Sequence, residues 1–153
     1  MAQCLRSFPE PYYFGEEARY EGSGGGNGNK NYNSDDTGGS GGGIIWISTP
    51  GTTDMQNSTV SSNGQWGLSM SFDQLGAGGG AGGSIQLTTL NLRGNGFISA
   101  RGGMGSSNGG GGGAGGRLVM NYLKSYLATS QPKQSFYWSG SHDVTGGPAG
   151  DMN

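Results

Sequence analysis

The chain has few apolar residues for a domain of its length. Only 31% of its 153 residues are hydrophobic, whereas globular domains usually contain about 45–50%. Glycine supplies 36 residues instead, and ordering a glycine costs more backbone entropy than ordering any other residue. The aromatic content of 10% and several aliphatic clusters nevertheless distinguish the chain from typical disordered sequences. We therefore predict a folded protein with a small core.

Charge and cysteine are also scarce, and each shortage argues against a class of function. Charged residues make up 12% of the chain and the formal net charge is −2, so we expect no nucleic-acid partner. Cys4 is the single cysteine, which excludes an internal disulfide framework and a multi-cysteine metal site. No apolar stretch approaches the roughly 20 residues that span a bilayer, and residues 1–20 do not have the pattern of a signal peptide. We therefore expect no membrane span, and any secretion signal would lie elsewhere in a longer parent protein.

The chain contains an imperfect internal repeat. Three glycine tracts each run into a short apolar segment, and together they occupy residues 38–47, 79–87 and 112–120. Aligning the tracts brings Ile44, Ile85 and Leu118 into register, at intervals of 41 and 33 residues. Units of this kind cannot bury an apolar face alone and must stack on their neighbours. This pattern predicts stacked short strands.

A second strand is predicted within each unit. Residues 59–64 match residues 97–102, and in both the apolar residue, Val60 or Ile98, has the alternation of a half-buried strand. Turns are predicted at Pro50-Gly51 and at residues 93–96, which contain residues typical of turns.

Helix signals are nearly absent. Residues 118–127 have helical spacing of Leu118, Tyr122 and Tyr126, but the glycine tract before them matches the tracts that precede the predicted strands. We assign this segment to a strand, with a short helix as the alternative.

The resulting fold prediction is all-β, a parallel β-helix-like solenoid of short strands connected by glycine-rich loops. The predicted inward stack consists of Ile44, Trp46, Val60, Ile85, Leu87, Ile98, Leu118 and Met120. Residues 1–21 are expected to form an N-terminal flank or cap, residues 22–127 the glycine-rich β-repeat region, and residues 128–153 a C-terminal flank or the start of a further unit. We expect the chain to be a fragment of a larger protein.

The glycine tracts have two interpretations. Either they are polyproline II strands packed side by side, where only a missing side chain permits close contact, or they are flexible linker-like loops. If they are packed, valine at Gly82 or Gly115 is destabilising, whereas valine at Gly110, in the middle of its tract, is expected to be silent.

The motif Ile98-Ser99-Ala100-Arg101-Gly102-Gly103, set between long glycine tracts, resembles the glycine-rich β-repeats of very large surface or secreted proteins of protists and bacteria. The resemblance covers residues 22–122 and implies an extracellular or cell-surface location, with a structural or adhesive role. The first unit departs from the pattern at residues 52–56 and at Gln65. A weaker resemblance links the chain to the glycine-rich region of certain receptor tyrosine kinases, in which glycine tracts form polyproline II bundles, although that family has cysteines that this chain lacks. Glycine-rich antifreeze bundles are a third comparison, and their strict three-residue glycine period is missing from this sequence.

Residues with catalytic or metal-binding chemistry are few. A phosphate-binding loop needs lysine and a hydroxyl residue after its last glycine, and Gly28-Asn29-Lys30-Asn31 has neither the spacing nor the hydroxyl. His142 and Asp143 lie near Ser139 and Ser141, but adjacency in sequence does not assemble a catalytic triad. Asp35-Asp36 is the one pair of adjacent aspartates, and it is a candidate for incidental calcium contact. We expect no catalytic residues, no cofactor and no metal site.

Two kinds of surface site have a recognisable motif. Asn57-Ser58-Thr59 is a sequon for N-glycosylation, placed in a predicted turn. Trp66 and Trp138 are candidates for stacking on sugar rings. The sequence therefore favours a non-catalytic structural or adhesive repeat module that contacts neighbouring repeats of the same parent protein or copies of itself. The alternative is a carbohydrate- or ligand-binding module that uses exposed aromatic residues to bind glycans.

Overall fold

The computed structural model describes residues 20–28, 37–69, 76–107, 109–122 and 138–151. Within these residues the regular structure is entirely β, with no helix, which confirms the predicted all-β class. The strands are β1 (Ile44–Asp54), β2 (Thr59–Ser61), β3 (Ser84–Arg93), β4 (Phe97–Ser99), β5 (Arg117–Tyr122) and β6 (Ser141–Asp143). Residues 118–122, the described part of the helix alternative, lie in strand β5.

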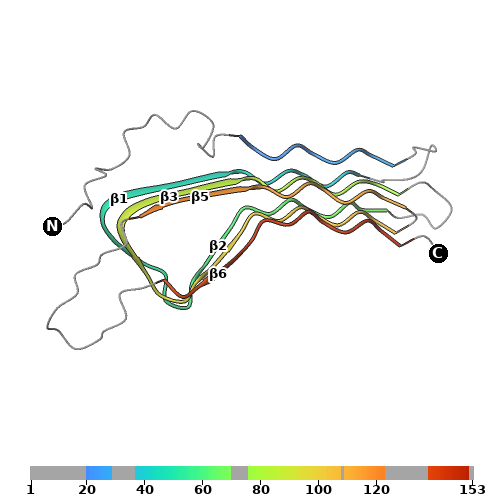
Figure 1. Ribbon diagram of the computed structural model, residues 1–153. Helices are drawn as coiled ribbons and strands as arrows, with labels where there is room; N and C mark the ends of the chain where they lie inside the picture. Colours follow the sequence, from blue (N-terminus) through green and yellow to red (C-terminus); the bar gives the residue numbers. More distant parts are fainter. Residues whose placement is uncertain (1–19, 29–36, 70–75, 108, 123–137, 152–153) are drawn as a thin grey trace, which may run out of the picture.

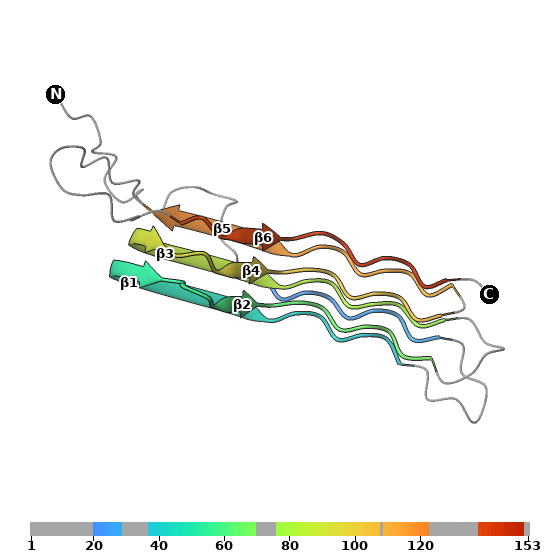
Figure 2. The ribbon, with the colours of Figure 1, turned by 90° about the horizontal axis from the view of Figure 1, so that it is seen from below.

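The strands form two small parallel sheets, ordered β1-β3-β5 and β2-β4-β6. Strand β1 leads through a sharp bend into β2, and β3 leads in the same way into β4, so that the bent segments lie side by side (Figures 1 and 2). Neither sheet closes, because each is a three-stranded sheet with two edge strands. The described residues therefore show parallel stacking of strands but no solenoid.

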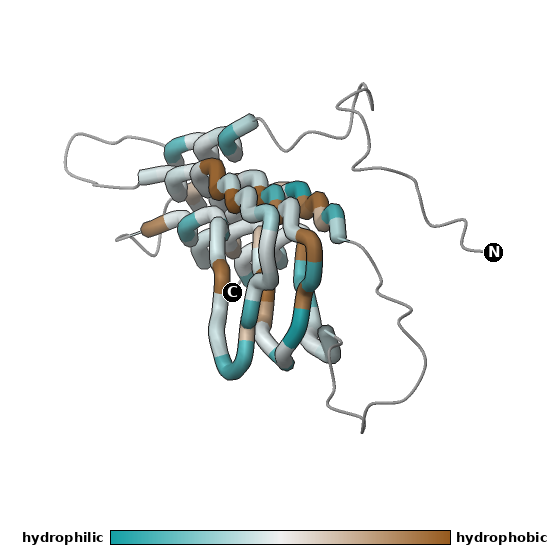
Figure 3. Tube along the Cα trace, turned by 90° about the vertical axis from the view of Figure 1, so that its left-hand side faces the viewer, coloured by the Kyte–Doolittle hydropathy of each residue, from teal (hydrophilic) through white to brown (hydrophobic). Residues whose placement is uncertain are grey.

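The two sheets converge on a small apolar core. Its buried residues are Met55, Ile85, Leu87, Leu92, Ile98 and Ala100, and the partly buried residues packed against them are Ile45, Ile47, Val60, Leu118, Met120 and Trp138. Figure 3 shows strongly apolar residues at only a few positions along the chain. Met55 belongs to this core although it lies in the segment that departs from the sequence pattern, because the bend after β1 turns it inward.

The predicted inward stack is wrong at Ile44 and Trp46, whose side chains are 43% and 61% exposed. The structure pairs Ile45 with Ile85 and Ile85 with Leu118, so the first interval is one residue shorter than the alignment of tracts implied. Because side chains alternate between the two faces of a strand, this shift moves Ile44 and Trp46 to the outer face and brings Ile45 and Ile47 inward. The predicted correspondence of Val60 with Ile98 is observed in the β2–β4 pairing.

The two predicted turns have different outcomes. Gly94 adopts a positive φ of 101° between β3 and β4, which favours glycine, as the predicted turn requires. Pro50-Gly51 instead lies within β1, where the register with β3 shifts between Thr49 and Thr52. The buried hydroxyl of Thr89 donates a hydrogen bond of 2.9 Å to the carbonyl of Gly51 at this point. The strand therefore bends at Pro50-Gly51 without ending.

The glycine tracts run side by side beyond the sheets as one bundle (Figure 1). We call this the glycine bundle, and its tracts are residues 20–28, 37–43, 62–69, 76–83, 100–107, 109–116 and 144–151. Backbone amides three residues apart donate to a neighbouring tract at 2.7–3.0 Å, as in the pairs Gly22/Gly25, Gly39/Gly42, Gly64/Gly67, Gly79/Gly82, Gly102/Gly105, Gly113/Gly116 and Gly147/Gly150. A period of three residues is that of the polyproline II helix. The tracts are packed together and are not separate loops.

Many glycines of the bundle have no room for a side chain. A Cβ atom at Gly82 would meet the carbonyl oxygen of Ala100, and one at Gly115 would meet that of Val144. Gly110, expected to tolerate valine, is equally confined, because its Cβ would meet the carbonyl oxygen of Ala77. The neighbouring Gly111, by contrast, faces open space, with no atom within 4 Å of the added Cβ. Whether a position of the bundle tolerates a side chain therefore depends on which of the three directions of the polyproline II helix it faces, and not on its distance from a strand.

We predict opposite effects of valine at Gly82 and at Gly111. Gly82→Val forces the neighbouring backbones apart and should lower the free energy of unfolding by about 1–3 kcal/mol or more. Gly111→Val should change it by no more than about 0.5 kcal/mol, as at an ordinary surface position. Thermal or urea unfolding of both variants measures the difference, and equal stability of the two would contradict the packed bundle.

Candidate binding surface

An exposed row of large side chains crosses one face of the glycine bundle. It consists of Trp66, Met104 and Pro148, which lie at the same level on parallel tracts because Gly67 N donates to Met104 O (2.9 Å) and Gly105 N donates to Pro148 O (3.0 Å). Trp66 is 66% exposed, Met104 is 37% exposed and Pro148 is exposed. We call these residues the Trp66 row. The glycine next to each of them, Gly67, Gly105 or Gly147, faces a neighbouring tract, so the three-residue period holds the large side chains on the outside.

A polar row lies one turn away from the Trp66 row, toward the strands. Asn63, Arg101 and Thr145 are exposed there. The side-chain oxygen of Asn63 accepts hydrogen bonds from Ser99 Oγ (2.6 Å) and from the backbone amide of Arg101 (2.7 Å). These hydrogen bonds orient the Asn63 side chain, and the Trp66 row and the polar row lie in parallel on one face of the bundle.

Trp138, the second candidate for sugar stacking, lies in a different environment. It is partly buried against the apolar core, and its ring stacks on that of His142 with 6.4 Å between centroids. The indole Nε1 is buried and has no hydrogen-bond partner among the described residues. The structure therefore does not bring Trp138 together with Trp66 on one surface.

The Ser, His and Asp residues near the end of the chain do not assemble into a hydrogen-bonded triad. His142 lies in β6, paired with Ile98 of β4. The Asp143 carboxylate accepts hydrogen bonds from the hydroxyl (2.7 Å) and the amide (2.9 Å) of Thr145. Both hydrogen bonds lower the pKa of the Asp143 carboxyl, and the bond from the hydroxyl has the larger effect. In the part of the chain that the structure describes, no cluster of three or more His, Cys, Asp or Glu residues could hold a metal ion.

Asn57 occupies the tight turn between β1 and β2. It has a positive φ of 51° and is exposed. Its amide donates to Asn95 Oδ1 (2.8 Å) on the adjacent turn, and Asn95 Nδ2 donates to Asn57 Oδ1 (3.2 Å). The predicted glycosylation site is thus on the surface, with its side-chain oxygen engaged by a neighbouring turn. Cys4, Lys30 and Asp35-Asp36 lie outside the described residues.

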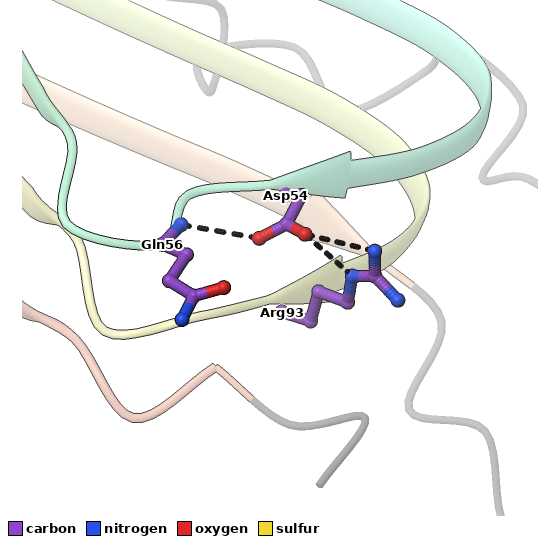
Figure 4. Close-up of polar contacts among 3 residues, drawn as sticks. All are labelled: Asp54, Gln56 and Arg93. Atoms are coloured by element: carbon purple, nitrogen blue, oxygen red, sulfur yellow. Dashed lines mark hydrogen bonds and ion pairs between the residues drawn. The ribbon is translucent and has the colours of Figure 1, made fainter. Parts of the chain in front are cut away.

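The bends of β1 and β3 are joined by an ion pair that the sequence reasoning missed. Asp54 Oδ2 lies 2.8 Å from Arg93 Nη2 and accepts a hydrogen bond from Arg93 Nε (2.9 Å), while Asp54 Oδ1 accepts one from the Gln56 amide (3.1 Å), as Figure 4 shows. Both charged side chains are about two-fifths exposed, so the pair contributes little to stability.

Comparison of the chain with protein-family models, curated proteins and solved structures gives no match. No helix of the described residues is long and apolar enough to cross a membrane.

We predict that Thr145 lowers the pKa of the Asp143 carboxyl. Thr145→Val removes the hydroxyl donor and should raise this pKa toward its ordinary value, whereas Thr145→Ser keeps the donor and should preserve the lowered pKa. Because the folded-state pKa is lowered, the stabilisation is present at neutral pH and is lost as the pH falls through that pKa. Titration of the Asp143 carboxyl carbon by NMR measures the shift, and identical curves for the two variants would contradict the assignment.

Proposed function

We propose that the chain is a non-catalytic structural or adhesive repeat module of a larger extracellular or cell-surface protein. The main support is that both sheets leave their edge strands on the same two flanks, β1 and β2 on one and β5 and β6 on the other (Figure 2). Unpaired strand edges present rows of backbone donors and acceptors that can pair with another strand. A further unit added at either flank would continue the same parallel stacking.

The partners in this proposal are neighbouring repeats of the same parent protein or second copies of the chain. With more units the open sheets would become a section of a β-solenoid, and the glycine tracts would form a bundle of polyproline II helices beside it. The parallel register supports this extension, since Val60, Ile98 and His142 already occupy equivalent positions in successive strands. In such arrays stability is roughly a sum of unit terms and nearest-neighbour terms.

We predict that tandem copies stabilise one another. A chain of two full copies joined by a Gly/Ser linker should melt at least about 3 °C above a single copy, because each new interface adds about 1 kcal/mol or more. Calorimetry measures the melting temperatures. An equimolar mixture of unlinked copies and a fusion to an unrelated soluble domain are the controls. A tandem chain that melts like the single copy would contradict stacking at the flanks.

A second candidate function is carbohydrate binding by exposed aromatic residues. The Trp66 row favours it, because a flat indole beside a polar row is the kind of surface that stacks on a sugar ring and donates hydrogen bonds to its hydroxyl groups. The role of Trp138 in this alternative is weakened by its packing against the core.

For this alternative we predict that Trp66→Ala abolishes binding to any glycan that the chain recognises on a glycan array. Trp46→Ala is the matched control, since Trp46 is similarly exposed but lies on the outer face of β1, away from the Trp66 row. Loss of binding in the control alone, or retention in both variants, would contradict a sugar site at Trp66.

A further inference from the structure

The glycine bundle contains one groove that is filled by a tract of the chain itself. Tract 20–28 lies between tracts 37–43 and 76–83 and is joined to both. It donates from Gly22 N to Gly42 O (2.7 Å) and from Gly25 N to Gly39 O (2.8 Å). On its other side, Gly78 N donates to Gly26 O and Ala81 N donates to Ser23 O, both at 2.8 Å. The groove therefore offers two acceptors on one wall and two donors on the other.

The next groove has the same walls in the same register. Tract 76–83 donates to tract 109–116 from Gly79 N to Gly111 O and from Gly82 N to Ala114 O, both at 2.9 Å. The bonds from Gly39 to Gly78 and from Gly42 to Ala81 have the same spacing and length, at 2.9 and 2.8 Å. In the second groove the carbonyls of Gly79 and Gly82 thus take the place of those of Gly39 and Gly42. The amides of Gly111 and Ala114 take the place of those of Gly78 and Ala81.

These four backbone groups have no partner among the described residues. The amides of Gly111 and Ala114 donate no hydrogen bond there, and the carbonyls of Gly79 and Gly82 accept none. Gly111 and Ala114 are exposed. A Cβ at Gly111 meets nothing within 4 Å, whereas one at the equivalent Gly78 lies 3.2 Å from Gly26 N of the tract that fills the first groove. Buried backbone groups are nearly always paired, and Gly79 and Gly82, which supply the two carbonyls, are buried.

We infer that this second groove, between tracts 76–83 and 109–116, is a binding site for an extended glycine-rich segment that runs antiparallel to both tracts. The occupant of the first groove defines the chemistry required. A Cβ at Gly22 would meet the carbonyl oxygen of Ala81 and one at Gly25 that of Gly78, so the segment needs glycine at every third position. Gly26 faces open space, so other positions tolerate a side chain.

The recognition is directed at the backbone and its period. A segment in the polyproline II conformation repeats every three residues and has no internal hydrogen bonds, so its amides and carbonyls are free to meet the donors and acceptors of the groove. A strand repeats every two residues and would present side chains to the wall. The occupant is therefore a segment of a partner chain that has the Gly-X-X period and small inward residues.

The test uses the full chain and a peptide with the sequence of tract 20–28, YEGSGGGNG. NMR titration should shift the amide signals of Gly111 and Ala114 and slow their hydrogen exchange. A short flexible peptide pays a large ordering cost, so we expect a dissociation constant on the order of 1 mM. Shifts of the Gly78 and Ala81 amides without shifts of Gly111 and Ala114 would mean exchange into the filled groove and would overturn the inference, as would no shift at all.

Matched variants test the period and the donors. A peptide with valine in place of the glycines equivalent to Gly22 and Gly25 should lose binding, while alanine in place of Gly26 should retain it. In the protein, Ala114→Pro removes the amide donor while keeping a backbone suited to polyproline II, and should weaken binding by at least about fivefold. Ala114→Ser keeps the donor and should bind as the unaltered chain does.

Equal binding of the unaltered peptide and the valine peptide would overturn the inference. Equal binding by the Ala114→Pro and Ala114→Ser proteins would also overturn it. If Ala114→Pro does not fold, the inference is tested by the unaltered chain alone. The unaltered peptide should then shift the amide signals of Gly111 and Ala114, and the valine peptide should not. The inference does not depend on the proposed function. The groove lies on a face of the bundle, whereas the tandem-copy experiment tests stacking at the edge strands of the two sheets. Either prediction can therefore be contradicted while the other is confirmed.

Discussion

Backbone hydrogen bonding between glycine tracts is the interaction on which the rest of this structure depends. Each tract presents donors every three residues to neighbours on different sides, as when Gly79 donates to tract 109–116 and Gly80 to tract 62–69. Such contacts need backbones close enough that a Cβ would strike a carbonyl oxygen, as at Gly82. The large entropic cost of ordering glycine is therefore offset by many short backbone hydrogen bonds, which side chains would prevent.

The apolar core has a different role from the one it has in most domains. Its large buried residues, such as Ile85 and Ile98, lie where the two sheets converge, and of its buried members only Ala100 belongs to a tract of the bundle. Strand pairing there sets the register, because Ile45, Ile85 and Leu118 align across β1, β3 and β5. The same register continues into the tracts, so a small core fixes the alignment of a long assembly of hydrogen bonds.

The surface follows from this arrangement. With three residues per turn, one position in three of an outer tract points to solvent, and this brings Trp66, Met104 and Pro148 to one level on adjacent tracts. The same geometry repeats the walls of a groove, which tract 20–28 fills in one place and no described tract fills in the next. Surfaces of this kind depend on register between tracts and not on any local motif.

The sequence by itself determined the β class and the pairing of Val60 with Ile98, because two-residue alternation is a local property that is readable over a few residues. It also indicated Trp66 and Asn57 as surface residues. The orientation of Ile44 and Trp46 was decided only by the tertiary structure, since glycine tracts contain no landmark that fixes their alignment to a single residue. For the same reason the sequence did not show that Gly110 is enclosed while Gly111 is open. That difference depends on which neighbouring backbone each position faces, and only the packed bundle determines it.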